Sequence, residues 1–158
     1  MGNLDSLRDW GHARDYVHMQ WLMLQQNEAR DYVIASGQQI SVRDFIQRSA
    51  LRLGITIQFE NSGLDERGIV AAIDYDVVTP RIGLNLGDVI VAVGERYFRP
   101  AEVESLLGDA SRARDELGWK PKTSLDEMID EMIANDLQEA QKRRLLADSG
   151  YQLSQPSD

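Results

Sequence analysis

The first segment whose side chains are suited to chemistry reads R-D-W-G-H-A-R-D-Y-V and spans residues 8–17. Arg8 lies just ahead of a predicted helix, where its planar guanidinium could bind an anion through two parallel hydrogen bonds. The alternative is structural: Arg8 forms an ion pair with Asp5 or Asp9, and Asp15 helps to cap the helix. The residue types alone favour the structural alternative.

A second segment, E-R-Y-F-R-P-A-E-V at residues 95–103, combines donors and acceptors at a predicted helix start. Pro100 is expected to open a short helix, because a proline at the first helical position gives up no hydrogen bond. Arg99 and Glu102 are three residues apart and therefore share a helix face. The arginine offers two donors to a phosphate, the carboxylate accepts from a diol such as ribose, and a helix N-terminus favours anions. The alternative is an exposed Arg99–Glu102 ion pair, which contributes less than about 1 kcal/mol.

No complete catalytic set accompanies these segments. The sequence has no G-x-G-x-x-G or P-loop phosphate-binding loop, no G-x-S-x-G serine motif and no tyrosine four residues ahead of a lysine. His12 and His18 are expected to be a helix-edge and a surface imidazole rather than metal ligands, because no H-E-x-x-H motif surrounds them. An anionic ligand would therefore depend on local arginines in this acidic chain.

The composition limits the class of protein. The chain has 158 residues, enough for one domain, and its 42% hydrophobic and 27% charged residues are typical of a soluble globular protein. A net charge of −9 argues against a nucleic-acid partner, and the lack of cysteine excludes disulfides and thiolate metal sites. The longest aliphatic run, 89–93, is too short to cross a membrane, and the first residues do not form a signal peptide. These features predict a cytoplasmic location.

Three helices are predicted from apolar spacing and from capping residues. The stretch 13–26 carries apolar residues at helical spacing, which predicts a broad buried stripe. That stripe comprises Val17, Trp21 and Leu24, with Tyr16, Met19 and Met23 beside them. Ser41 is expected to cap a second helix, which ends before a left-handed Gly54. Ser124 and Glu127 have the spacing of a capping box at the start of a last, long helix. Its predicted core stripe comprises Leu125, Met128, Ile129, Met132, Ile133 and Leu137.

Four short segments are candidate strands. Residues 55–60 alternate between apolar and polar side chains, which is the strongest strand signal in the chain. The runs 32–35, 69–73 and 88–93 are also rich in residues that favour strands. Together, the predicted helices and strands describe a mixed α/β chain with three or four short strands.

Several motifs give the sequence a family resemblance. They read G-N-L-D-S-L-R-D-W-G-H-A-R-D-Y-V, W-L-M-L-Q-Q, V-I-A-S-G, S-V-R-D-F, D-V-I-V-A-V, R-Y-F-R-P-A-E-V-E-S-L-L-G-D and R-D-E-L-G-W-K-P-K. In this order, from Gly2 to about Tyr151, the chain closely resembles GDP-mannose 4,6-dehydratases, members of the extended short-chain dehydrogenase/reductase superfamily. R-D-W-G-H-A-R-D-Y-V and R-Y-F-R-P-A-E-V are specific to that family. The segment 74–86 matches poorly and is assigned no role.

The resemblance implies a fold class and an activity. The chain is similar to the C-terminal, substrate-binding portion of these α/β enzymes, with few short strands, three to five helices and an incomplete Rossmann half. Residues 1–151 would form this portion and 152–158 a frayed tail. Complete enzymes convert GDP-D-mannose to GDP-4-dehydro-6-deoxy-D-mannose and water with bound NADP, on the route to GDP-fucose. Their Gly-rich loop and Tyr-x-x-x-Lys pair belong to the N-terminal Rossmann half, so the cofactor's main site is expected outside this chain.

The resemblance also assigns residues to a substrate site, and no catalytic residue or metal ligand. By likeness to the family, Gly2 and Asn3 lie next to the nucleotide, while Tyr97 is a weaker candidate for a wall of the site. In the same way, Arg8 and Arg99 contact the diphosphate and Glu102 contacts the guanosine ribose. One departure is the pair at 94–95, Gly-Glu, where relatives often carry Asp-Pro; a glycine there loosens the approach to the site.

The resemblance leaves three functional hypotheses. Met1 occupies a place where relatives usually carry an aliphatic strand residue, so we expect a truncated gene, an expressed fragment or a reading frame begun too late. The leading hypothesis is the substrate-binding part of a dehydratase, inactive when isolated. It needs a Rossmann half in the same or another chain and forms a homo-oligomer when complete. The alternatives are a non-catalytic GDP-sugar-binding or interaction module, and a non-functional truncation.

Overall fold

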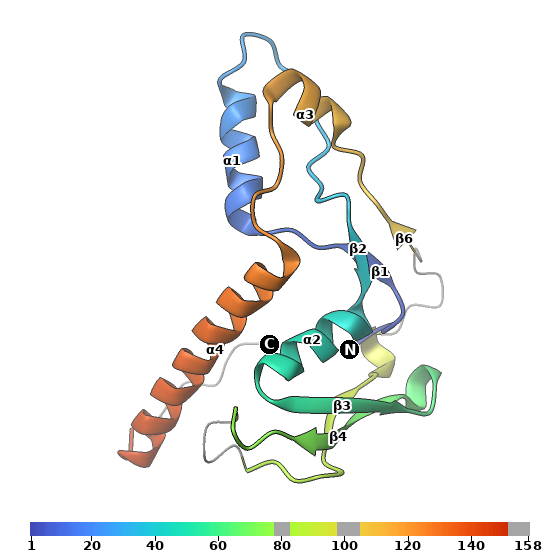
Figure 1. Ribbon diagram of the computed structural model, residues 1–158, viewed down its shortest axis with the longest axis vertical. Helices are drawn as coiled ribbons and strands as arrows, with labels where there is room; N and C mark the ends of the chain where they lie inside the picture. Colours follow the sequence, from blue (N-terminus) through green and yellow to red (C-terminus); the bar gives the residue numbers. More distant parts are fainter. Residues whose placement is uncertain (78–82, 98–104, 152–158) are drawn as a thin grey trace.

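The computed structural model describes residues 1–77, 83–97 and 105–151, which form an elongated α/β molecule (Figure 1). The helices among these residues are α1 (Ala13–Leu24), α2 (Val42–Arg52), α3 (Ser111–Leu117) and α4 (Leu125–Asp148). The strands are β1 (Leu7–Asp9), β2 (Gln39–Ser41), β3 (Ile55–Glu60), β4 (Arg67–Ile73), β5 (Val89–Ala92) and β6 (Ser105–Leu106). Two single-turn 3-10 helices, η1 (Gly63–Asp65) and η2 (Glu95–Tyr97), complete the described elements.

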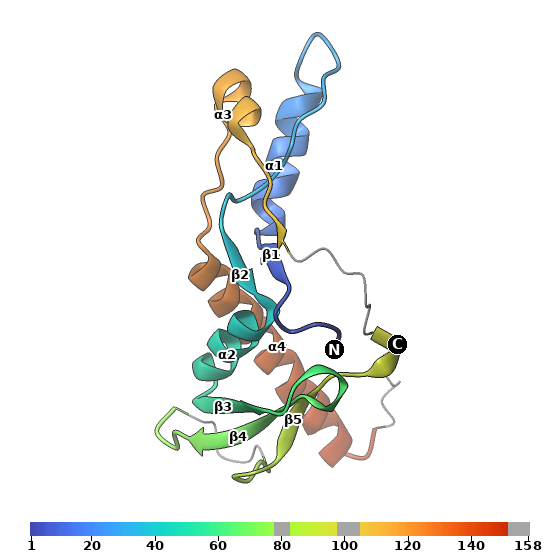
Figure 2. The same ribbon diagram turned by 90° about the vertical axis from the view of Figure 1, so that its right-hand side faces the viewer.

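The strands form two small sheets at different levels of the molecule (Figure 2). In the first sheet β1 lies between β2, which is antiparallel to it, and β6, which is parallel. The second sheet is the antiparallel meander β3-β4-β5. Helix α2 packs its apolar face on this meander, around a core of Ala50, Ile55, Ile57 and Val70. Helices α1 and α3 pair at the opposite end, around Met19, Ala113 and Trp119.

The predicted helix ends are confirmed by their capping contacts. Ser41 Oγ accepts a hydrogen bond from Asp44 N at the start of α2, and Gly54 follows the helix at φ 71°, in the left-handed region that favours glycine. At the start of α4 the capping box forms in full between Ser124 and Glu127. The strands predicted at 55–60, 69–73 and 88–93 are present as β3, β4 and β5; the bounds of β3 are those predicted, and those of β4 and β5 differ by at most two residues. The helix expected at Pro100 and the tail 152–158 lie outside the described residues.

The buried stripe predicted for the first helix, α1, was wrong for three of its residues. Its inner face is formed by Met19, which is fully buried, and by Tyr16 and Met23 beside the same core. Three members of the predicted stripe are instead exposed: Val17 to 61%, Trp21 to 55% and Leu24 to 81%. Apolar spacing does not distinguish these adjoining faces, and only one of them meets α3. Met132, placed in the core stripe of α4, is likewise 45% exposed.

The strand prediction was also wrong in two respects. The run 32–35 forms no strand among the described residues, although Tyr32 and Ile34 pack on the α1–α3 core. A strand exists only with a neighbour that takes its backbone hydrogen bonds, and the described part of the chain supplies none here. Conversely, β1, β2 and β6 were not predicted, so the described sheets hold six strands rather than three or four.

Candidate functional site

The N-terminal stretch runs beside the end of the β3-β4-β5 sheet. The Met1 amino group donates a hydrogen bond to Ala92 O at 3.0 Å, and Gly94 N donates to Met1 O at 2.9 Å. Gly2 then passes so close to η2 that a Cβ atom on it would lie 2.6 Å from Tyr97 O. A side chain at position 2 would therefore push the two segments apart. Gly2 and Tyr97, two of the predicted site residues, lie against each other.

Asn3 and Tyr97 offer polar and aromatic groups at this place. Asn3 Oδ1 accepts a hydrogen bond from Asp5 N at 2.9 Å, which fixes a turn directly after Gly2. Its side-chain amide nitrogen makes no hydrogen bond to the residues that the structure describes. The Tyr97 ring is 58% exposed, and the guanidinium of Arg96 lies 5.7 Å from its centroid. An exposed ring beside a cation can contribute a wall to a ligand site.

Arg8 lies in the middle strand of the first sheet. Its neighbours in register are Ile40 on β2 and Leu106 on β6. The guanidinium Nη1 donates to Leu7 O at 2.8 Å. Arg8 also lines an open, mainly apolar cleft of about 410 Å³, together with Asp9, Tyr16, Ile34, Ala35, Leu106, Leu107 and Gly108. The position of Arg8 is therefore set by the pairing of β1 with both β2 and β6.

Arg99 and Glu102 lie outside the described residues, but the residues before and after their segment are described. Tyr97 lies against Gly2, and Ser105 pairs with Leu7. The two described residues that flank this segment, Tyr97 and Ser105, thus both contact the N-terminal stretch 2–8, which carries Gly2, Asn3 and Arg8. The structure therefore places Gly2, Asn3 and Arg8 on one short stretch of chain, and Tyr97 lies against that stretch.

The structural alternatives for the first segment are not found among the contacts of the described residues. Asp5 forms an ion pair with Arg43, and Asp9 accepts hydrogen bonds from Ser36 N at 2.7 Å and Gly37 N at 2.9 Å. The capping residue of α1 is His12, whose Nδ1 accepts from Arg14 N at 3.0 Å. The prediction that Asp15 caps this helix was wrong, because a histidine is an uncommon capping residue and its role has no clear sequence signal.

Asp15 instead connects α1 to the segment before α4. Its carboxylate accepts hydrogen bonds from Lys122 N at 3.0 Å and Thr123 N at 2.9 Å, and it is only 5% exposed. Burial works to raise the pKa of Asp15. The hydrogen bonds from the backbone of Thr123 and Lys122, from the Thr123 side chain, and the nearby His12 together outweigh it, so the pKa lies below its ordinary value. A contact between residues more than a hundred positions apart has no local sequence signal.

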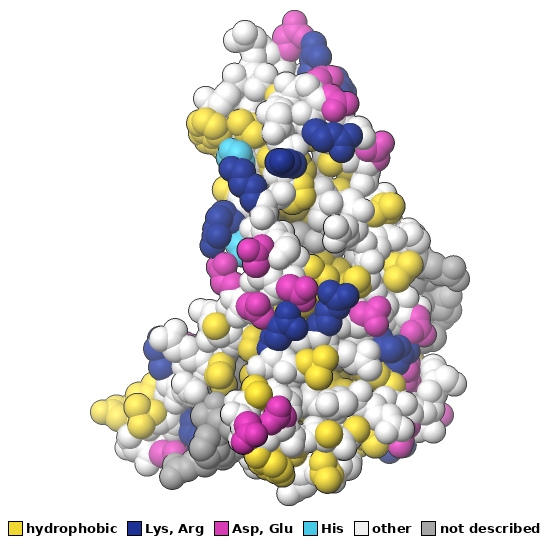
Figure 3. Space-filling view, in the orientation of Figure 1, with side chains coloured by type: hydrophobic (Ala, Val, Ile, Leu, Met, Phe, Trp, Pro, Cys, Tyr) yellow, Lys and Arg dark blue, Asp and Glu magenta, His cyan; other side chains and the backbone are white. Residues whose placement is uncertain are grey.

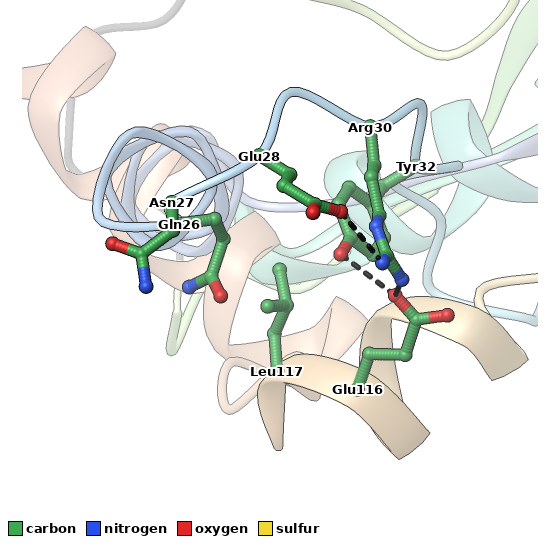
Figure 4. A pocket seen from close by; sticks show the side chains of 7 residues that line it. All are labelled: Gln26, Asn27, Glu28, Arg30, Tyr32, Glu116 and Leu117. Atoms are coloured by element: carbon green, nitrogen blue, oxygen red, sulfur yellow. Dashed lines mark hydrogen bonds and ion pairs between the residues drawn. The ribbon is translucent and has the colours of Figure 1, made fainter.

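A polar pocket of about 470 Å³ lies at the α1–α3 end of the molecule (Figure 4). None of the described candidate site residues, Gly2, Asn3, Arg8 and Tyr97, lines it. The Tyr32 hydroxyl donates to Glu116 Oε2 at 2.8 Å, and Arg30 reaches Glu116 and Glu28. Hydrogen bonds from Arg112 and Tyr32 hold the pKa of Glu116 below its usual range. Arg30, the arginine in the described lining of this pocket, is paired with the carboxylates of Glu28 and Glu116. The pocket therefore does not fit the diphosphate of a dinucleotide cofactor.

Other kinds of site are not found in the described part of the chain. No group of three or more histidine and acidic side chains there could hold a metal ion. Within the same residues, no helix has the length and apolar content needed to cross a membrane.

Solved structures define the class of fold. The chain is similar to RMD from Pseudomonas aeruginosa, solved with NADPH, at a TM-score of 0.55 and 20% identity, covering 85% of this chain and 34% of the other. It is also similar to the Bordetella bronchiseptica enzyme WbmG, solved with NAD and UDP, at a TM-score of 0.53 and 18% identity, covering 85% and 33%. The described residues, with four α-helices and two small sheets, share the α/β fold of one portion of these two enzymes.

Sequence similarity identifies the family within that class. The family model for GDP-mannose 4,6 dehydratase matches residues 1–132, and the chain belongs to this family. It is 54% identical over 154 residues to the GDP-mannose 4,6-dehydratase of Vibrio cholerae serotype O1, covering 98% of this chain and 40% of the relative. The human GDP-mannose 4,6 dehydratase is 42% identical over 138 residues, covering 87% and 34%. The chain thus spans about two-fifths of the length of its bacterial relative and corresponds to the C-terminal part.

Proposed function

We propose that this chain supplies the substrate-binding part of a GDP-mannose 4,6-dehydratase. The complete enzyme would convert GDP-D-mannose to GDP-4-dehydro-6-deoxy-D-mannose and water, using NADP. The observation that carries the proposal is that Tyr97 and Ser105, the described residues before and after the segment of Arg99 and Glu102, both contact the stretch 2–8. This arrangement lies within the 132 residues that match the family model.

Each proposed ligand contact has a chemical reason. A diphosphate is bound well by the forked donors of Arg8 and Arg99, and an adjacent pair of ribose hydroxyls suits the carboxylate of Glu102. Gly2 allows close approach of the backbone, and Asn3 offers an amide beside it. Tyr97 would form one wall of the nucleotide site.

The dehydration itself would require residues outside this chain. Removal and return of a hydride need a bound nicotinamide and a proton-transfer group near the sugar. The sequence contains neither a Gly-rich loop nor a Tyr-x-x-x-Lys pair. The isolated chain would bind substrate without turning it over.

A Rossmann half, in the same or another chain, is the partner that we propose. Two features support it. The first is the exposed face of Val17, Trp21 and Leu24 on α1; Figure 3 shows apolar side chains on the outer edge of the α1 end of the molecule. The second is the β-prone run 32–35, which pairs with no described strand. Exposed apolar faces and unpaired strand edges are typical of surfaces that another element covers. A partner sheet that adds a strand beside 32–35 would also cover Val33, which is exposed in this run.

Binding of GDP tests the proposed site. We expect the wild-type chain to bind GDP in calorimetry, and Arg99→Glu to weaken that binding at least about tenfold, because it replaces a donor with a like charge. Arg143→Glu makes the same change of charge on the exposed end of α4, where Arg143 pairs only with Glu139 among described residues. This control should bind GDP as the wild type does.

The outcomes separate the remaining hypotheses. Unchanged binding by a folded Arg99→Glu chain would remove Arg99 from the site. A folded wild-type chain that does not bind GDP would overturn the proposal and favour a non-functional truncation. GDP binding by a stable monomer with no Rossmann half would favour the non-catalytic module.

A further inference from the structure

Arg43, in the first turn of α2, contacts three separate segments around the candidate site. Its Nε and Nη2 atoms donate to Asp5 Oδ1 at 3.1 and 2.7 Å, and its Nη1 donates to Glu66 Oε1 at 2.5 Å. The guanidinium also lies 4.6 Å from the centroid of the Phe59 ring on β3. One side chain therefore joins the N-terminal stretch to the β3-β4-β5 sheet.

The backbone strengthens the link on the N-terminal side. Arg43 N donates to Leu4 O at 2.8 Å, and Val42 N donates to Ser6 O at 3.2 Å. Leu4 and Ser6 are each only 1% exposed. The stretch that carries Gly2 and Asn3 is thus fixed by α2 on one side, while Met1 is fixed by Ala92 and Gly94 on the other.

Glu66 extends the link to η2. It is 8% exposed, and its backbone oxygen accepts a hydrogen bond from Val93 N at 3.2 Å. Val93 is followed by Gly94 and η2, where Tyr97 lies against Gly2. The chain of contacts from Asp5 through Arg43 and Glu66 therefore reaches both sides of the Gly2–Tyr97 contact.

We propose that Arg43 is a positioning residue, which sets Gly2 and Asn3 against Tyr97 so that the nucleotide meets a preformed site. The proposal rests on the proposed function, because it concerns the same site. Arg43 is well suited to this role: its planar fork binds two carboxylates at once and stacks on an aromatic ring, which an ammonium group cannot reproduce. A ligand gains affinity when its site is ordered before binding.

The main experiment removes the Arg43–Glu66 pair without leaving a buried charge unpaired. The double variant Arg43→Met with Glu66→Gln replaces both ionised groups by neutral ones of similar shape. The matched control is Arg52→Met with Asp130→Asn. It removes an ion pair between α2 and α4, in which Arg52 Nε lies 2.6 Å from Asp130 Oδ1. GDP binding is measured by calorimetry at a temperature at which circular dichroism shows every chain to be folded.

We expect the Arg43→Met/Glu66→Gln chain to bind GDP at least about tenfold more weakly than the wild type, a loss of about 1.4 kcal/mol. The Arg52→Met/Asp130→Asn control should stay within twofold. Wild-type affinity in the first variant, or an equal loss in the control, would overturn the positioning role. If the wild-type chain binds no GDP, the proposed function fails instead, which is a distinct result.

A milder change keeps the proposal testable if the double variant does not fold. Arg43→Lys retains the charge but loses the fork, so it can hold Asp5 or Glu66 but not both in the present geometry. We expect this variant to fold and to bind GDP several-fold more weakly. Wild-type affinity in a folded Arg43→Lys chain would overturn the proposal.

Discussion

Replacing Trp119 with alanine is expected to lower the free energy of unfolding by about 3–5 kcal/mol. Trp119 is 2% exposed and forms the centre of the α1–α3 core with Met19 and Ala113. Its indole nitrogen also donates to Asp15 O at 3.0 Å. The change would leave a cavity and remove a buried hydrogen bond at once. Urea unfolding followed by circular dichroism measures the loss.

Trp21→Ala is the matched control, since the same side chain is removed from the exposed face of α1. Trp21 is 55% exposed and touches His18, with ring centroids 6.3 Å apart. We expect its loss to change the stability of the isolated chain by no more than about 0.5 kcal/mol. A large loss would mean that this face is already covered within the chain, which contradicts the proposed Rossmann partner. A small loss for Trp119→Ala would contradict the core assigned to α1 and α3.

Asp15→Asn is expected to destabilise the chain by about 2 kcal/mol at neutral pH, because hydrogen bonds to a charged acceptor are stronger than those to an amide. Asp15 is the buried acceptor for the backbone of Lys122 and Thr123, just before α4. Its folded-state pKa is lowered, so its ionised form contributes stability above the ordinary pKa of about 3.9. That contribution is lost as the pH falls through the lower, folded-state pKa.

The pH dependence makes this prediction specific. The difference in stability between the wild type and Asp15→Asn should be largest near neutral pH and should shrink in acid, because the variant has no carboxylate to protonate there. Asp136→Asn, on the exposed part of α4, makes the same chemical change and should alter stability little at any pH. An unchanging gap between wild type and Asp15→Asn from pH 7 to 3 would refute the role given to the ionised carboxylate.

The helices could be predicted because their signals are local. Ser41, Ser124 and Glu127 make cap contacts within three residues of themselves, and Gly54 needs only its own backbone conformation. The exposed face of α1 could not be predicted from its apolar spacing. Which face of such a helix is buried depends on where α3 packs, more than eighty residues later.

The strands illustrate the opposite case. β1, β2 and β6 are two or three residues long and exist only through pairing between distant segments, so they carry little local signal. The run 32–35 has the local signal but no partner in the described residues. The candidate site shows the same division. The resemblance assigned both Gly2 and Tyr97 to one site, and the structure places them against each other. The Arg43–Glu66 contact, in contrast, spans 23 positions and has no sequence pattern that reveals it.

The most direct test of the central claim is a calorimetric titration of GDP-mannose into the wild-type chain with NADP present, with the 4-keto sugar product assayed in the same sample. The claim is that this chain binds the nucleotide sugar but lacks the groups that transform it. It predicts saturable binding with a Kd tighter than about 1 mM, equivalent to about −4.1 kcal/mol, and no product. Product from the chain alone, or a folded chain with no detectable binding, would contradict it.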